Sequence, residues 1–231
     1  MTRRPGCHLV TGAGSGIGAA VTNVLHERGD ELWLLARSDA RAAELAERFP
    51  GAGTVVADLA DPASLAGLTG LPERLDTLVH VAGVVELATV AELGPEELRA
   101  QLDVNLAAPM LLTRACLPAL RAARGLVLLV NSTSGLAANP TWSAYAASKF
   151  GLRAFADALR AEEAGHGVRV SSVYPSRTAT PMQQKVHDQE GKEYDPTAWV
   201  SPETVAASIV HVLDLPPDGT ITDLTVRTGP A

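Results

Sequence analysis

Short apolar runs alternate with amphipathic segments along almost the whole chain, and this alternation limits the folds that the chain can adopt. We expect strands at residues 7–11, 31–36, 53–57, 76–81, 125–131, 168–174 and 220–226. Helical patterns lie between them, at 17–29, 38–49, 62–68, 96–123 (two consecutive helices), 142–164 and 202–214. Strands that alternate with helices predict parallel pairing through right-handed crossovers. The chain is therefore expected to form an α/β fold, a doubly wound parallel sheet of about seven strands with helices on both faces.

Length and charge restrict the domain count and the partners. A chain of 231 residues fits one large domain, so we place a single unit over 1–231. The chain has 19 basic and 26 acidic residues, a net charge of −7, and no block rich in Lys and Arg, which argues against nucleic acid as a partner. Cys7 and Cys116 lie far apart without metal-ligand spacing, so we expect two reduced, buried thiols and no metal site.

Two further segments indicate local structure and location. Pro202 with Ser201 as N-cap predicts a helix start, and the prolines at 216 and 217 with Gly219 predict a turn. The N-terminus lacks a long apolar core, and no later stretch reaches about 18 uninterrupted apolar residues. We therefore expect no membrane contact and a cytoplasmic location.

A glycine-rich segment connects the first predicted strand to the first predicted helix. A backbone without Cβ atoms can approach a pyrophosphate closely, and a helix N-terminus offers free N–H donors and a favourable dipole. A lone glycine pattern is weak evidence, but the flanking strand and helix strengthen it. The segment predicts a dinucleotide site with contacts from Thr11, Gly12, Gly14, Ser15, Gly16, Ile17 and Gly18.

The end of the second predicted strand bears on which dinucleotide binds. A fold that prefers NAD usually carries an acidic residue there for the ribose 2′-hydroxyl. This chain has Ala36, Arg37 and Ser38 instead, and an arginine can neutralise and hydrogen-bond a 2′-phosphate. We expect NADP, with NAD as the alternative if Arg37 merely starts a solvated helix and Asp39 meets the ribose.

Tyr145 and Lys149 are four residues apart on a predicted helix, so they share one face. A phenol with a pKa of about 10 is a poor base at neutral pH, and a fixed cation stabilises its phenolate. Such a pair is suited to reversible proton transfer to a substrate oxygen. Alone, a tyrosine and a lysine at this spacing usually serve packing and solvation, so the prediction depends on the glycine-rich segment as well.

Taken together, these motifs resemble those of the short-chain dehydrogenase/reductase family over nearly the whole chain. Thr11-Gly12-x-x-x-Gly16-x-Gly18 is similar to the family's cofactor turn, and Ser132, 13 residues before Tyr145, is similar to its catalytic serine. The resemblance implies a Rossmann fold and a tetrad of Asn105, Ser132, Tyr145 and Lys149. It also implies an adenine-contacting pair, Asp58 and Leu59, and nicotinamide contacts from Pro175 and Thr180.

The chain departs from the family's pattern at two places. The family's Asn-Asn-Ala-Gly after the fourth strand is His80-Val81-Ala82-Gly83 here, and its Pro-Gly after the sixth strand is Pro175-Ser176. We interpret His80 as a structural replacement rather than an additional acid or base. Ala82 and Gly83 remain expected cofactor contacts, with Gly83 leaving room for the ribose, whereas Ser176 adds a side chain near the nicotinamide.

The activity implied by the resemblance is hydride transfer between NADP(H) and a carbonyl or secondary alcohol. Tyr145 would exchange the hydroxyl proton, Ser132 hold the substrate oxygen, Lys149 bind the nicotinamide ribose and lower the tyrosine pKa, and Asn105 place a water. The alternative is a catalytically silent, cofactor-binding sensor on the same fold.

Segment 176–200 is expected to cover the substrate, a small ketone or alcohol, and its polar run is interpreted as a solvated helix. Family members usually pair through the long helices around the fifth strand. Here the apolar residues of 107–123 and 143–164 predict a homodimer or homotetramer.

Overall fold

The protein, seen in a computed structural model, is described over residues 5–229, with the backbone alone at Ala66. Strands β1 (Cys7–Thr11), β2 (Glu31–Ala36), β3 (Gly53–Val56), β4 (Thr77–His80), β5 (Leu126–Val130), β6 (Arg169–Pro175) and β7 (Asp223–Val226) form one sheet. All neighbouring strands are parallel, in the order β3-β2-β1-β4-β5-β6-β7. Because the chain leaves β1 toward β2 and returns on its other side at β4, the crevice of a doubly wound sheet opens between β1 and β4.

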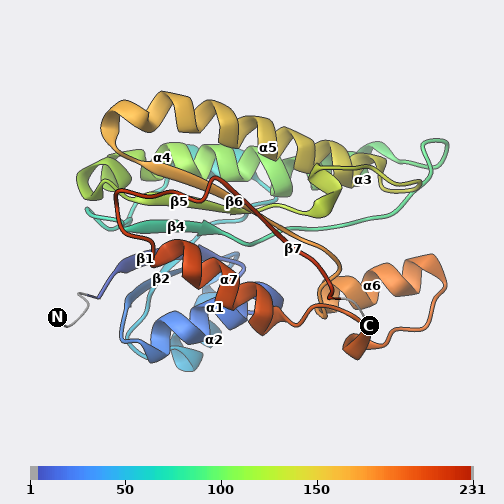
Figure 1. Cartoon of the computed structure of the whole chain (residues 1–231), viewed down its shortest axis with the longest axis horizontal. Helices are drawn as coiled ribbons and strands as arrows, with labels where there is room; N and C mark the ends of the chain where they lie inside the picture. Colours follow the sequence, from blue (N-terminus) through green and yellow to red (C-terminus); the bar gives the residue numbers. More distant parts are fainter. Residues whose placement is uncertain (1–4, 230–231) are drawn as a thin grey trace.

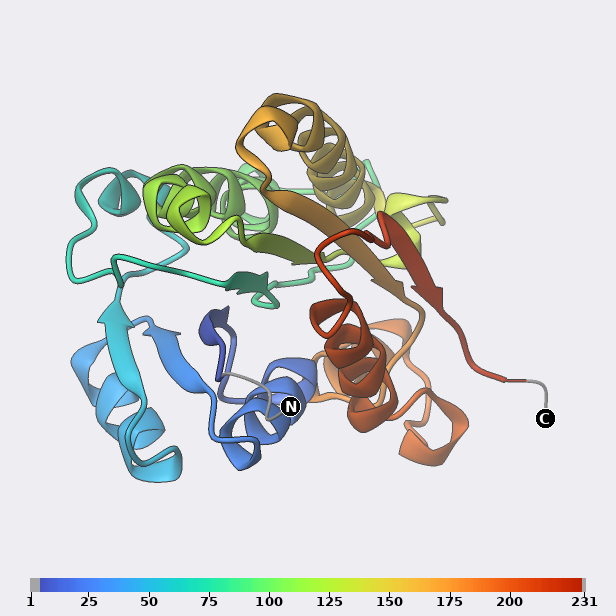
Figure 2. The same ribbon diagram turned by 60° about the vertical axis from the view of Figure 1, so that its left-hand side comes forward.

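Helices cover both faces of the sheet (Figure 1). One face carries α1 (Gly16–Glu27), α2 (Asp39–Arg48) and α7 (Pro202–Leu213), and the other carries α3 (Pro95–Leu102), α4 (Ala108–Ala123) and α5 (Ser143–Glu163). Helix α6 (Pro181–Glu190) lies at one end of the sheet, near α7 (Figure 2). The predicted Rossmann fold is therefore confirmed, with β3 and β7 at the two edges.

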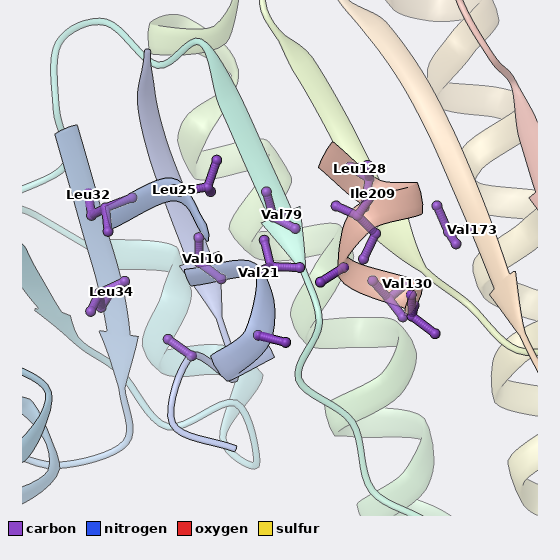
Figure 3. Packing of buried hydrophobic residues seen from close by; sticks show 14 of the residues in the cluster. Val10, Val21, Leu25, Leu32, Leu34, Val79, Leu128, Val130, Val173 and Ile209 are labelled. Carbon is purple, nitrogen blue, oxygen red and sulfur yellow. The ribbon is translucent and has the colours of Figure 1, made fainter. Parts of the chain in front are cut away.

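Apolar side chains from the strands fill a separate core on each face. Val10, Leu34 and Val79 point from the sheet toward Val21 of α1 and Ile209 of α7, as Figure 3 shows. On the opposite face the strands pack against α4 and α5. Strands buried on both faces explain the nearly continuous apolar runs in the sequence.

The element boundaries agree with the sequence to within a few residues, with three exceptions. Residues 62–68 form a 3₁₀ helix, Pro62–Gly67, in place of a regular helix. The break expected within 96–123 is a π-helical turn, Asp103–Ala107, between α3 and α4. The final strand begins only at Asp223, after the predicted turn in which Gly219 donates to the Pro216 carbonyl at 3.0 Å. Ser201 caps α7 as predicted, since its hydroxyl accepts from the Thr204 amide at 3.1 Å.

Cys7 and Cys116 are both free and buried, as predicted. Burial raises the pKa of each thiol to about 12, so neither is a reactive thiolate at neutral pH. Over residues 5–229, none of the helices combines the length and the apolar character needed to cross a membrane. The same residues contain no cluster of three or more His, Cys, Asp or Glu side chains suited to a metal ion.

Candidate active site

The glycine-rich turn between β1 and α1 has a backbone that only glycine accommodates well. Gly12 and Gly16 have φ values of 70° and 50°, in the left-handed region. A Cβ at Gly12 would lie 2.9 Å from the Ala82 amide nitrogen, and one at Gly18 would overlap the Gly12 carbonyl. The turn therefore folds tightly against the end of β4 and leaves the α1 N-terminus, with Ser15 as its N-cap, open to a ligand.

Thr11 holds this turn against β4. Its hydroxyl accepts from the amides of Val81 and Ala82, both at 3.0 Å, and its side chain is buried. The threonine thus positions the turn, and it does not itself line the cavity described below. Gly83 follows, and a Cβ there would lie 3.2 Å from Asn105 Oδ1 and 3.9 Å from Lys149 Nζ. The glycine keeps open the space beside Asn105 and Lys149, and its expected contact with the cofactor ribose stays a prediction.

Tyr145 lies in the first turn of α5, buried against Trp142, whose ring centroid is 5.6 Å away. Burial raises the pKa of Tyr145 to about 12, and a hydrogen bond with Ser132 opposes that increase. The net shift in the chain by itself is therefore opposite to the decrease expected from Lys149, and the effect of Lys149 with a cofactor bound stays a prediction. Without a ligand, the phenol is protonated at neutral pH.

Lys149 lies one helical turn after Tyr145, and its ammonium is 5.7 Å from the centroid of the tyrosine ring. The ammonium donates to the Val130 carbonyl at the end of β5, at 3.1 Å. Burial lowers the pKa of Lys149 to about 8. A lysine with one hydrogen bond has donors to spare, so the ammonium can also bind a polar ligand that enters beside Gly83.

Asn105 lies in the π-helical turn between α3 and α4. Its amide exchanges two hydrogen bonds with the backbone of Val84, at 2.8 and 2.9 Å, and donates to Ser148 Oγ at 3.1 Å. Such turns often occur at functional sites. Asn105 therefore joins the segment after β4 to α5, and it lies behind the cavity wall rather than in it.

Asn131 is a site residue that the motifs did not indicate. Its amide donates to the Lys149 carbonyl at 3.1 Å and accepts from the Ser132 amide at 2.9 Å, so it connects the serine to the lysine's helix. A Cβ at Gly135 would lie 2.5 Å from the Asn131 side-chain oxygen. The spacing of Ser132 and Gly135 contained this signal, because a glycine just after a polar strand end implies close packing.

The glycine turn, Ser132, Tyr145 and Lys149 line one cavity of about 350 Å³ at the carboxyl ends of the strands. Among the predicted site residues, the following line it: Gly12, Ser15, Gly16, Ile17, Gly18, Ala82, Gly83, Ser132, Tyr145, Lys149, Pro175 and Thr180. Apolar side chains that the motifs did not single out form much of the remaining wall: Val85, Trp142, Met182 and Val186. Thr180 caps α6, and its hydroxyl accepts from the Gln183 amide at 3.3 Å.

The predicted adenosine contacts lie outside this cavity, beyond the glycine turn. Arg37 is exposed directly after β2, and Ser38 caps α2 by accepting from the Arg41 amide at 3.3 Å. Asp58 and Leu59 follow β3, where the Asp58 carboxylate accepts from the Ala60 amide at 2.9 Å. Their position past the ends of β2 and β3 is the one expected for groups around an adenosine.

Two arginines of α2 lie against the glycine turn, and the motifs missed both. The Arg48 guanidinium donates to the Gly14 carbonyl at 3.2 Å. A Cβ at Gly14 would overlap the Arg41 guanidinium, which pairs with Glu44. Arg48 therefore brings a positive charge to the turn, whereas the charge of Arg41 is balanced by Glu44.

The two departures from the expected pattern have structural roles. His80 is buried, its Nε2 is 2.9 Å from the Thr113 hydroxyl on α4, and burial lowers its pKa to about 3. It is neutral and lies away from the cavity, consistent with the structural interpretation. Ser176 does line the cavity, and its hydroxyl accepts from the Thr228 amide at 3.3 Å.

The residues present fit a nicotinamide dinucleotide. The glycine turn leaves a cradle that Cβ atoms would fill, and the α1 N-terminus supplies N–H donors at its side. At the end of the cavity away from the glycine turn, the Lys149 ammonium has unused N–H donors, and Gly83 leaves space beside it. A pyrophosphate at the turn and a ribose at Lys149 would use these groups without displacing a side chain from the core.

Comparison with known proteins agrees with this geometry. The family model described as short chain dehydrogenase matches residues 7–191. The short-chain type dehydrogenase/reductase y4eK of Sinorhizobium fredii is 34% identical over 94% of this chain and 89% of its own. Oxidoreductase UcpA of Escherichia coli is 32% identical over 90% of this chain and 80% of its own.

Solved structures show the same architecture. An oxidoreductase of the short-chain dehydrogenase/reductase family from Burkholderia thailandensis superposes with a TM-score of 0.83 at 32% identity, over 97% of this chain and 92% of that one. An NADP-bound structure titled as a putative NAD(P)-dependent gluconate 5-dehydrogenase, from Beutenbergia cavernae, gives a TM-score of 0.81 at 29% identity, over 95% and 94%. This chain belongs to the short-chain dehydrogenase/reductase family of oxidoreductases.

Proposed function

We propose that the protein transfers a hydride between NADP(H) and a small ketone or secondary alcohol, with Tyr145 as the acid and base. The observation that carries this proposal is the buried Tyr145 hydroxyl in the cavity wall, hydrogen-bonded to Ser132 and one helical turn from Lys149. A tyrosine between a hydroxyl and an ammonium in a concave space with apolar walls is suited to proton exchange with a carbonyl oxygen.

The protein's own groups would divide the work as follows. The nicotinamide, when bound, supplies or accepts the hydride. Ser132 holds the substrate oxygen beside Tyr145, and the raised tyrosine pKa keeps the phenol protonated and ready to donate during carbonyl reduction. Alcohol oxidation needs the Tyr145 phenolate. The positive charge of the Lys149 ammonium would stabilise this phenolate when the ammonium is held beside the tyrosine. Asn105, hydrogen-bonded to Val84 and Ser148, holds α5 against the segment after β4 and would place a water beside the lysine.

NADP is the cofactor that the charge at the end of β2 supports. Arg37 can meet the charge of a 2′-phosphate, Ala36 stands where an acidic residue would repel that phosphate, and Arg48 adds positive charge beside the glycine turn. The Beutenbergia cavernae relative was crystallised with NADP, which agrees with this assignment. Segment 176–200 would then cover the substrate, because Ser176, Thr180 and Met182 from it line the cavity.

Tyr145→Phe tests the acid/base role. Loss of the Tyr145 hydroxyl should lower kcat by about 10²-fold to 10⁴-fold, the usual contribution of a positioned acid. The Kd for NADPH should stay nearly unchanged. The matched control is Tyr174→Phe, because Tyr174 is also a buried tyrosine but donates to Asp223 at 2.8 Å, away from the cavity.

Ketone-dependent NADPH oxidation measures turnover, and nicotinamide fluorescence measures binding. Wild-type activity in the Tyr145→Phe variant would contradict the proposed mechanism. Tight NADPH binding by the wild type without turnover of any ketone or alcohol in a broad panel would instead favour a cofactor-sensing protein.

A further inference from the structure

The reaction cavity contains little unpaired charge. Among the charged side chains of the described part of the chain, two line it: Lys149 and Arg177. Lys149 lies on the side of Gly83, where the proposed cofactor ribose would bind. Arg177, just after β6, therefore decides the charge that the substrate side of the cavity presents.

Arg177 is fixed by an acidic partner and two aromatic rings. Its two terminal nitrogens donate to the two carboxylate oxygens of Glu190, at 3.0 and 2.5 Å. The guanidinium lies 5.8 Å from the Trp142 ring centroid and 5.4 Å from that of Trp199. Glu190 ends α6, and its side chain is only 12% exposed. Bidentate pairing of this kind uses one N–H of each terminal nitrogen, balances the charge of the guanidinium and fixes the orientation of its plane.

Arg177 lines the cavity, and the charge that it brings is balanced by Glu190, which lines a neighbouring outer hollow together with Arg177 and Lys192. Lys192 also donates to Glu190, at 3.1 Å, but its side chain is 63% exposed, so solvent screens its charge. The hydrogen bond from Arg177 is the largest of the effects that hold the pKa of Glu190 below its usual value, so the carboxylate stays ionised at neutral pH.

On the basis of the proposed function, we propose that Arg177, neutralised by Glu190, is a specificity-determining residue that makes the site select uncharged, apolar ketones and alcohols over those that carry a carboxylate. The rest of the substrate wall agrees with this class, since Val85, Met182 and Val186 meet the ligand with apolar surface. A carboxylate placed there would lose its water and find the nearest guanidinium already paired.

A matched pair of ketones tests the proposal: methyl 4-acetylbenzoate, which is neutral, and 4-acetylbenzoate, which carries the charge on nearly the same skeleton. The readout is the ratio of kcat/KM for ester over acid with saturating NADPH. The ratio of Kd values for the Tyr145→Phe–NADPH complex, measured by calorimetry, provides a second readout that needs no turnover. We expect the wild type to favour the ester by about tenfold or more.

Glu190→Gln removes the negative charge and frees Arg177, so the ratio should move about tenfold or more toward the acid. In the double variant Arg177→Leu/Glu190→Gln, which removes both charges of the pair and leaves Lys192 exposed to solvent, the ester preference should return. Glu193→Gln removes the same charge from an exposed position on the same segment and is the matched control, with a ratio equal to that of the wild type.

A wild type that takes the acid as well as the ester would overturn the proposal, as would a Glu190→Gln ratio equal to that of the wild type in folded protein. Failure of both molecules to bind at millimolar concentration would overturn it too. Absence of turnover with the predicted Kd ratios would contradict the proposed function alone, and the assignment of Arg177 would remain.

Discussion

At the scale of single residues, Lys149 shows a conflict between stability and function. It is a buried lysine whose ammonium has one carbonyl partner, and burial lowers its pKa to about 8 from an ordinary value of 10.5. A shift of this size corresponds to a cost of about 3 kcal/mol for keeping the group charged at neutral pH. The cost falls where the proposed function requires a cation beside Tyr145.

Lys149→Met should therefore stabilise the ligand-free protein while removing activity. The variant removes the cost of the buried charge but also loses the hydrogen bond to Val130. The net effect should be a gain of about 2 kcal/mol in the free energy of unfolding at pH 7. The folded wild type releases its proton near pH 8 and the unfolded chain near 10.5, so the unfolded state binds more protons in this window. Wild-type stability then rises with pH relative to the variant, and the difference should shrink toward pH 10.5.

Urea unfolding of both proteins from pH 7 to pH 10, without cofactor, measures this difference. Lys192→Met is the control, because the Lys192 side chain is 63% exposed and its removal should leave no such pH dependence. A stability difference between wild type and Lys149→Met that stays constant with pH would show that Lys149 is not strained by burial.

Arg37 carries the proposed choice of cofactor. Charge-assisted hydrogen bonds contribute about 1.5–3 kcal/mol, so Arg37→Ala should weaken NADPH by about tenfold to a hundredfold and leave NADH nearly unchanged. Arg99→Ala, an exposed arginine on α3, is the control for the same change in net charge. Fluorescence titration of the three proteins with both reduced cofactors gives the six Kd values. Equal losses for both would mean that Arg37 supports the fold, and a wild-type preference for NADH would transfer the role to Asp39.

At the scale of elements, α6 is fastened across the cavity to the segment after β4. Lys185 pairs with Glu86 at 2.5 Å, Gln189 donates to Glu86, and the Leu87 amide donates to Gln189 at 3.2 Å. Most of these contacts are exposed, and exposed pairs contribute little each. Glu86 takes part in two of them, so its removal would break most of these polar contacts.

Glu86→Ala should loosen α6 without changing the sheet. A loss of about 1 kcal/mol would speed amide exchange in 181–190 about fivefold and raise the KM for the ketone more than it lowers kcat. Glu92→Ala is the control, because Glu92 lies on the same segment and accepts from Thr89 at 2.8 Å instead of from α6. Hydrogen–deuterium exchange resolved by peptide is the measurement. Unchanged protection of 181–190 would show that packing alone holds the helix.

At the scale of the whole molecule, the outer faces of α4 and α5 carry exposed apolar side chains. Met110 and Phe150 are each 42% exposed, although both helices already cover the sheet with their inner faces. Apolar groups that one sheet does not need are typical of an association surface. They support the sequence-based expectation of a symmetric homodimer or homotetramer, which stays a prediction.

Light scattering at micromolar concentration should give two or four times the chain mass, and Phe150→Glu should reduce that mass by placing charges opposite each other across a two-fold axis. Glu162→Gln, which changes charge at an exposed position farther along α5, is the control. A monomeric mass for the wild type would refute the expected assembly.

The fold could be predicted from the sequence because its signals are local. Each apolar run is long enough for a strand, the glycines of 12–18 require left-handed or crowded backbone, and Ser201 with Pro202 begins a helix by capping alone. The order of these elements then limits the sheet to a doubly wound arrangement, since crossovers between parallel strands are right-handed. The pairing of Tyr145 with Lys149 is local too, because four residues make about one helical turn.

Other properties depend on contacts between residues far apart in the chain. Thr11 meets Val81, Asn131 meets Lys149, and Arg177 meets Glu190 only after the sheet has formed. The same holds for burial, which raises the Tyr145 pKa to about 12 where the sequence alone predicted a decrease. The sequence determined which groups can react, whereas the tertiary structure decided their protonation and the charge of the cavity, because desolvation and ion pairing depend on distances that no local pattern encodes.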